Sequence, residues 1–281
     1  MSNNSIVVFN KVDKSIGKQE ILKNVTFNVE KGEVIGIIGA NGSGKTTILR
    51  LASGLSYTTN GEIFIEGKIV KPGMVGNLPS GVGILIESPN FIGHLTGFEN
   101  LYYLSKIRNE INENDIYETL KEVGLDPKNK KKVSEYSLGM RQRLGIAQAI
   151  MEKPNLILLD EPTNALDKEG VELFAKIINK YKNMGISFIF VSHSTEEIQR
   201  FCDRVFKIEN RGLLLQNTIQ DWHIILENLE DIERVLQLKA DARIGERHNG
   251  KPVVIAPFQE KLEMVSFFDR LNIKYEILRD E

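Results

Sequence analysis

The chain reads Gly39-Ala40-Asn41-Gly42-Ser43-Gly44-Lys45-Thr46 directly after the apolar run Val34–Ile38. This G-x-x-x-x-G-K-T string lies between a predicted strand and a helix that begins near Lys45. Its glycines let backbone N–H groups curl around a phosphate, and the positive end of the helix dipole points to the same place. Lys45 adds a charge for the β and γ phosphates, and the Thr46 hydroxyl suits a magnesium ion. A plain Gly-rich turn is the alternative, but the preceding strand favours nucleoside triphosphate binding. The contacts are expected from Gly39 to Thr47.

Length and composition are those of a globular protein. The 281 residues allow one large domain and a small one, and 41% apolar residues suffice for a packed core. A net charge of −2 gives no general attraction for nucleic acid, and no basic stripe is interleaved with aromatics. We therefore expect no nucleic-acid partner.

Targeting features indicate the cytosol. The single cysteine, Cys202, can form no internal disulfide, and the polar start Met1–Asn4 lacks the apolar core of a signal peptide. No apolar run approaches the roughly 18 to 20 residues that span a bilayer, so a membrane role would need a partner. The basic run Lys128–Lys132 is interpreted as a solvated loop.

Periodicity predicts an α/β domain over residues 1–218 with a parallel central sheet. Strands are expected at Leu156–Leu159 and Ser187–Val191, with a helix at Lys168–Met184 between them. The segment from Lys45 to Leu156 is too long for one crossover, so it should contain an inserted subdomain at about 88–152. Helical composition there covers Glu99–Arg108, Glu113–Val123 and Gly139–Met151. Period-two patches at Ile6–Phe9 and Val25–Val29 predict an antiparallel portion at one edge.

The tail, residues 219–281, is predicted to be a small α+β accessory domain. Pro252–Pro257 reads as a strand, Gln259–Leu271 as a helix and Ile273–Leu278 as another strand. The tail either packs on the core or a dimer partner, which we favour, or binds a regulatory ligand; no motif decides between these.

Two acids end the apolar strand at Leu156–Leu159. Ligands in open α/β sheets bind at such carboxyl ends. Asp160 is placed to hold magnesium through water, and Glu161 to take a proton from an attacking water. A strand ending in solvated acids is the alternative, and the loop at Gly39–Thr46 makes it the weaker one.

Upstream of this strand the chain reads Tyr136-Ser137-Leu138-Gly139-Met140-Arg141-Gln142-Arg143-Leu144. Ser137 is a natural N-cap for a helix, and Gly139 keeps the backbone open. Together with the acids and the order of motifs, the segment resembles the signature of ATP-binding cassette (ABC) ATPases. Ser137, Gly139, Gln142 and Arg143 match that signature, whereas Tyr136 and Leu138 depart from it. The resemblance covers roughly residues 5 to 215.

The resemblance assigns further residues. Asn164–Asp167 looks like the family's D-loop, and His193 looks like its switch histidine, which would contact the γ-phosphate or the attacking water. A lone histidine is more often structural, but this one follows a strand at its carboxyl end. The family binds ATP with magnesium and closes two cassettes head to tail, so Ser137 and Gly139 would serve nucleotide held by another chain. The resemblance also assigns Gln142 to nucleotide binding. That chain is a second copy or a different cassette.

Two departures from the family pattern stand out. Glu87 replaces the usual Gln after the second core strand; its carboxylate would contact magnesium more tightly but adds negative charge. The string Leu-Ile-Glu-x-Pro-x-Phe around it is similar to ATPases of bacitracin- and lantibiotic-resistance exporters. Ile16 replaces the aromatic residue that usually stacks on adenine and offers only apolar contact; Phe9 is the alternative for that role.

The sequence therefore predicts the ATP-hydrolysing motor subunit of an ABC transporter, of the peptide-antibiotic exporter type. It would lie in the cytoplasm against the inner face of the membrane, and the helical insertion would pass its motion to a separate permease. The runner-up is a soluble ABC ATPase acting on ribosomes or DNA. Such relatives generally carry tandem cassettes or a long coiled-coil insertion, and neither is present in this sequence.

Overall fold

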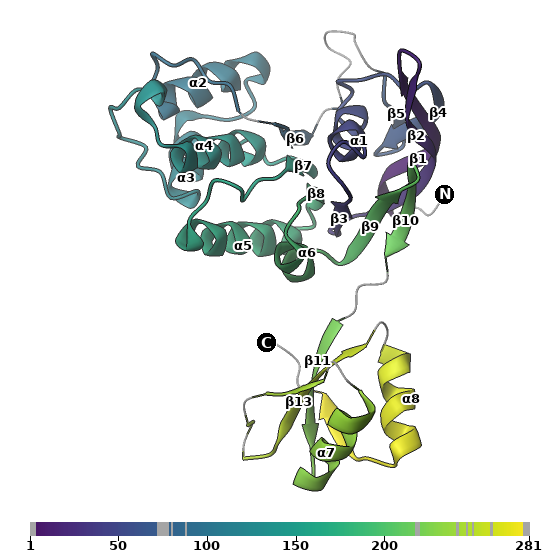
Figure 1. Cartoon of the computed structure of the whole chain (residues 1–281). Coiled ribbons are helices and arrows are strands. Elements are labelled where there is room, and N and C mark those ends of the chain that lie inside the picture. The colour runs from purple at the N-terminus through teal and green to yellow at the C-terminus, as the bar shows by residue number, and fades with distance from the viewer. Residues whose placement is uncertain are drawn as a thin grey trace. The chain divides into compact units, whose positions relative to one another are not determined.

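The chain forms two compact units, Met1–Gln216 and Asn217–Glu281. The computed structural model describes residues 4–71, 79, 81–87, 89–216, 220–239, 242–245, 247–248, 250–258 and 261–277 (Figure 1). Within these residues, no helix is both long enough and apolar enough to cross a membrane.

A six-stranded sheet forms the centre of the first unit, with strand order β10-β9-β3-β8-β7-β6. Five strands are parallel: β3 (Val34–Ile38), β6 (Val82–Leu85), β7 (Leu156–Asp160), β8 (Ser187–Val191) and β9 (Arg204–Glu209). The edge strand β10 (Gly212–Gln216) is antiparallel to β9. The prediction of a parallel central sheet is confirmed, and so are its strands at Leu156–Leu159 and Ser187–Val191.

The central sheet is covered on both faces, which explains why β7 is apolar throughout. Ile157 and Leu159 pack into the core beneath the helices, whereas Leu156 and Leu158 pack into the core shared with a second sheet and α1. Successive strand residues point to opposite faces, so a strand buried on both sides cannot alternate apolar with polar residues.

The second sheet is antiparallel, with order β2-β1-β4-β5. Its strands are β1 (Ser5–Ile16), β2 (Gln19–Glu30), β4 (Asn60–Ile65) and β5 (Lys68–Ile69). The predicted patches Ile6–Phe9 and Val25–Val29 lie within β1 and β2. They belong to this separate sheet and not to the edge of the parallel one. Phe9 stacks on Phe27 with ring centroids 4.5 Å apart, inside the core between the two sheets.

Helices follow the parallel strands β3, β6, β7 and β8, as Figure 1 shows. The segment between β6 and β7 is helical and forms α2 (Gly97–Arg108), α3 (Glu113–Glu122), a 3-10 turn (Val133–Glu135) and α4 (Leu138–Ile150). The remaining helices are α1 (Lys45–Ala52), α5 (Lys168–Asn183) and α6 (Thr195–Phe201). Local signals fix several starts: Thr96 and Glu99 form a capping box before α2, and Asp167 caps α5.

The second unit has β-α-β-β-α-β order, the split βαβ arrangement of ferredoxin-like folds. Its elements are β11 (Gln220–Leu226), α7 (Leu229–Leu238), β12 (Arg243–Ile244), β13 (Val253–Phe258), α8 (Lys261–Leu271) and β14 (Tyr275–Ile277). The antiparallel sheet has order β12-β13-β11-β14, and Ile224, Val254 and Phe268 are fully buried in its core. The predicted strand-helix-strand is its second half. Two ends of that prediction, Gln259 and Leu278, lie outside the described residues.

Candidate active site

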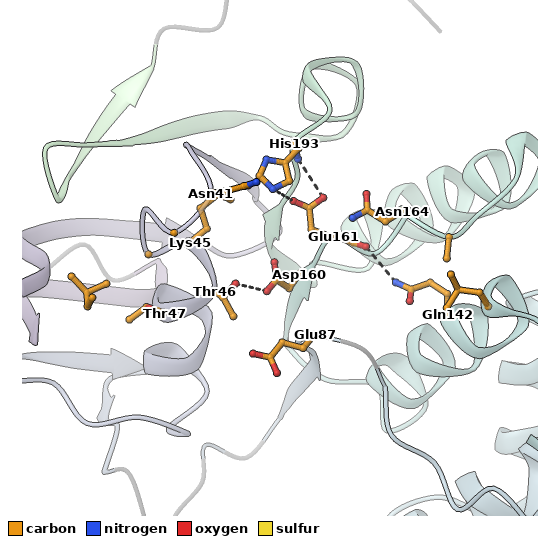
Figure 2. Close-up of a pocket in the computed structure, with 15 residues that line it drawn as sticks. Asn41, Lys45, Thr46, Thr47, Glu87, Gln142, Asp160, Glu161, Asn164 and His193 are labelled. Atoms are coloured by element: carbon orange, nitrogen blue, oxygen red, sulfur yellow. Dashed lines mark hydrogen bonds and ion pairs between the residues drawn. The ribbon is translucent and has the colours of Figure 1, made fainter. Parts of the chain in front are cut away.

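A cavity of about 620 Å³ opens at the carboxyl ends of β3 and β7. Parallel strands bring their carboxyl ends to one edge of a sheet, which is where α/β proteins bind ligands. The loops after β3, β6, β7 and β8 all contribute to it (Figure 2). Its lining consists of Ile21, Asn41, Gly42, Gly44, Lys45, Thr46, Thr47, Glu87, Leu138, Gln142, Asp160, Glu161, Asn164, Ala165 and His193.

The loop before α1 has the geometry of a phosphate cradle. Gly42 and Gly44 have φ angles of 75° and 107°, which a side chain would strain. Gly44 is the N-cap of α1 and provides no side-chain hydrogen bond, so the first N–H groups of the helix have no side-chain acceptor at this cap. These donors and the helix dipole suit an anion.

Lys45 is held against the same loop. Its Nζ donates to the carbonyl oxygens of Gly39, at 2.8 Å, and Ala40, at 3.0 Å. An ammonium group has three protons, so one donor remains for a phosphate oxygen. Burial lowers the pKa of Lys45, and the nearby Glu161 and Asp160 charges oppose that shift.

Thr46 and Asp160 meet at the floor of the cavity. The Thr46 hydroxyl donates to Oδ2 of Asp160 at 2.7 Å. Burial raises the pKa of Asp160, although the hydrogen bond from Thr46 and the charge of Lys45 each lower it.

This hydroxyl and carboxylate are hard oxygen donors that fit a magnesium ion. The described residues contain no group of three or more His, Cys, Asp or Glu side chains that could hold a metal. Magnesium at nucleotide sites is commonly held by one or two carboxylates together with substrate phosphates, so such a group is not required.

Glu161 and His193 face each other across the ends of β7 and β8 (Figure 2). The backbone N–H of His193 donates to Oε2 of Glu161 at 3.3 Å. The ring atom Nε2 lies 3.0 Å from Oε1, which makes an ion pair when the imidazole is protonated. This buried oxygen has no hydrogen-bond partner among the described residues. Burial raises the pKa of Glu161, and the charge of His193 partly offsets the rise.

Glu87 lines the cavity from the loop after β6, with a left-handed φ of 61°. Its Oε1 lies 2.6 Å from Nη2 of Arg50, in an ion pair that the sequence analysis did not anticipate. The Glu87 charge also contributes to the raised pKa of Asp160. The predicted magnesium contact of Glu87 thus has a competing cationic partner.

The signature segment is not brought to the phosphate loop of the same chain. Ser137 accepts a hydrogen bond from the backbone N–H of Met140, which confirms it as the N-cap of α4. Neither Ser137 nor Gly139 lines the cavity, whereas Leu138 does with 62% of its surface exposed. These predicted nucleotide contacts are therefore not assembled within one chain.

Gln142 lines the cavity but its amide is already engaged. Nε2 donates to the carbonyl oxygen of Pro162 at 2.9 Å and makes a longer contact, 3.4 Å, to that of Glu161. The residue ties α4 to the turn after β7. Its predicted contact with nucleotide stays a prediction, and the observed bonds indicate that it positions Glu161.

Neither residue expected to contact the adenine base lines the cavity. Ile16, at the end of β1, is 61% exposed and does not line the cavity. The alternative, Phe9, is wrong for this role because it is fully buried against Phe27. Ile21 on β2 lines the cavity and was missed, since the sequence does not reveal which face of the hairpin turns toward the phosphate loop.

A phosphate loop, an adjacent hydroxyl and buried acid, and a carboxylate facing a histidine define the class: a P-loop ATPase cassette. Residues 22–164 match the ABC transporter family, and the chain belongs to that family. The protein is an ABC ATPase, which confirms the resemblance found in the sequence.

Its relatives include transport ATPases. The uncharacterized ABC transporter ATP-binding protein YybJ of Bacillus subtilis (strain 168) is 43% identical, over 72% of this chain and 91% of that protein. The bacitracin transport ATP-binding protein BcrA of Enterococcus faecalis is 36% identical over 75% of this chain and 68% of that protein. The lantibiotic transport ATP-binding protein SrtF of Streptococcus pyogenes is 35% identical over 78% and 92%, respectively.

A solved structure supports the fold. The ATP-binding cassette MJ0796, as a dimer in a post-hydrolysis state bound to ADP and Pi, superposes with a TM-score of 0.68. It is 26% identical and covers 75% of this chain and 97% of that chain. The similarity confirms the predicted α/β P-loop fold.

Proposed function

We propose that this ATPase drives an exporter of peptide antibiotics, in which two cassettes close head to tail on ATP and a separate membrane permease carries the cargo. One observation supports the motor chemistry above all. The phosphate loop, the Thr46–Asp160 contact and the Glu161–His193 pair converge on one cavity. The cargo class follows from BcrA and SrtF, whose names give bacitracin and lantibiotic transport.

In this proposal the loop at Gly39–Thr46 and Lys45 bind the β and γ phosphates. Thr46 and Asp160 would hold magnesium, Asp160 through water, with Glu87 nearby. The ion supplies Lewis-acid polarisation of the phosphates when it is bound. The chain's own groups neutralise phosphate charge and orient the triphosphate, which is most of what phosphoryl transfer requires.

Glu161 acts as the general base. Its Oε1 lies 3.0 Å from Nε2 of His193 but accepts no hydrogen bond among the described residues, so it keeps capacity to accept a proton from water. The raised pKa of its carboxyl makes it a stronger base than an ordinary glutamate. His193 contacts both oxygens of this carboxylate, one through its backbone N–H and one through its ring, and so orients it. Its ring is exposed enough to reach a γ-phosphate.

The signature segment completes a site on another chain. Ser137 is exposed, Gly139 is half-buried, and both lie outside the lining of their own chain's cavity, so they are available to a second cassette. We infer a homodimer or a pair with a different cassette, with the helices between Glu87 and Ser137 transmitting closure to the permease. Because no helix in the described ranges can span a membrane, the transport path would belong to that permease.

The test is a resistance assay. Cells that lack the gene, and the same cells complemented with wild type or Glu161→Gln, are exposed to bacitracin and to a lantibiotic. We expect wild type alone to restore survival, with both proteins present at equal levels by immunoblot. Equal sensitivity of all strains to both compounds would contradict the cargo class. Resistance from the Glu161→Gln form would contradict the motor role of this site.

A further inference from the structure

Arg50 stands on the same face of α1 as Thr46, one helical turn further along. Its guanidinium donates from Nη2 to Oε1 of Glu87 at 2.6 Å. The backbone there is well anchored, because the Arg50 carbonyl accepts hydrogen bonds from the N–H groups of Leu55 and Ser56 at 2.9 and 3.1 Å. Arg50 thus reaches the cavity's distinctive acid from a fixed point next to the proposed metal ligands.

The cavity has an excess of negative charge. Three acids, Glu87, Asp160 and Glu161, line it, whereas the lining contains one lysine, Lys45, among the described residues. A bound nucleotide brings further negative charge, so each uncompensated acid weakens phosphate binding. Glu87 lies on the Thr46 and Asp160 side of this space (Figure 2).

We propose that Arg50 is the dedicated counter-ion of Glu87, and that it sets the affinity of this cavity for nucleotide by cancelling the carboxylate's charge. The inference rests on the proposed nucleotide site. It explains how the chain carries an acid where the family usually has a neutral amide. Arg50 is then a positioning residue, because it acts on the phosphates through Glu87.

An ordinary surface ion pair is the alternative, and the chain supplies a matched example. Arg200 and Glu172 also lie 2.6 Å apart, with side chains 40% and 60% exposed, against 48% and 60% for Arg50 and Glu87. Exposed pairs of this kind contribute little to stability. The difference is position: neither Arg200 nor Glu172 lines the cavity. Arg200→Gln is therefore the control for Arg50→Gln.

The experiment is a double-mutant cycle on nucleotide binding. Wild type, Arg50→Gln, Glu87→Gln and the double variant are titrated with a fluorescent ATP analogue, once in EDTA and once with excess magnesium. In EDTA, we expect Arg50→Gln to weaken binding about three- to five-fold, as expected for one half-exposed charge. Adding Glu87→Gln should restore binding, and magnesium should reduce the loss because the unpaired carboxylate attracts the cation. Arg200→Gln should bind like wild type.

Arg50→Lys separates charge from geometry, since lysine keeps the charge without the planar fork. We expect it to recover at least half of the lost affinity. The effect should also shrink in high salt, which screens exposed charges. Thermal unfolding confirms that each variant is folded.

Additive effects of Arg50→Gln and Glu87→Gln on nucleotide affinity would overturn this inference but not the proposed nucleotide site. So would a loss of affinity in Arg50→Lys equal to that in Arg50→Gln. Wild-type protein that fails to bind the nucleotide would overturn the proposed site as well.

Discussion

The phosphate-loop face and the signature face of this chain differ in how their polar groups are used. On the phosphate-loop face, Lys45, Thr46 and Asp160 are bonded to one another or to the loop and point into a cavity. On the signature face, the Ser137 side chain caps its own helix and Leu138 is largely exposed. One face is organised within the chain, and the other is presented outward. This contrast is what a site shared between two chains would produce.

The largest effect is expected when the general base, Glu161, is removed from the phosphate-loop face. Glu161→Gln keeps the shape but cannot accept a proton, so we expect ATP turnover to fall by about 10²- to 10³-fold while ATP binding persists. Light scattering after size exclusion with ATP should then detect a stable dimer. The exposed Glu118→Gln on α3 is the control. A monomer with unchanged turnover would rule out Glu161 as the base.

The second test sets the two faces against each other. Lys45→Ala impairs one face and Gly139→Asp the other, so each protein alone should be nearly inactive. Mixed together, they should recover roughly a quarter of wild-type turnover, because half of the dimers are mixed and each holds one intact site. Phosphate release by the mixture is the measurement. Lys45→Ala alone, at the same total protein concentration, is the control. No recovery in a mixture that still dimerises would place the whole site within one chain.

The features of the fold and the site that could be predicted from the sequence are those that depend on adjacent residues. The loop from Gly39 to Thr46, the acids after β7 and the Ser137 cap are local patterns, and each has a local physical cause. The Arg50–Glu87 pair and the approach of Ile21 depend on which faces of separate elements meet in space. A sequence pattern gives the period of a strand or helix but not its neighbour.

Sequence reasoning was also weaker in the second unit. The helix α7 carries acids in its first turn and an apolar stripe through Ile232 and Val235, yet it was not predicted. The strands of this unit have no motif that fixes their order. The strands β1 and β2 were found as patches, because register shifts along their pairing interrupt the period of two.

The third prediction concerns the pH dependence of turnover at the phosphate-loop face. Glu161 must be deprotonated to act, and burial raises the pKa of its carboxyl. Turnover should therefore fall on acidification at a higher pH than for an ordinary glutamate. The His193 charge lowers this pKa, so His193→Ala should shift the acid limb to still higher pH, besides slowing turnover. The measurement is kcat against pH at saturating nucleotide. An acid limb in His193→Ala at or below the wild-type position would contradict this coupling.

The smallest effect is expected at the base-binding edge of the phosphate-loop face. Ile16 is exposed and away from the cavity lining, so it contributes little to base recognition. In Ile16→Tyr an aromatic ring can stack on adenine, an interaction of about 0.5–1.5 kcal/mol. We expect ATP to bind roughly two- to ten-fold more tightly, measured by displacement of a fluorescent nucleotide, and Ile16→Leu to match wild type. Unchanged ATP affinity in Ile16→Tyr would mean that this edge does not approach the base, and that Ile21 or another chain provides the contact.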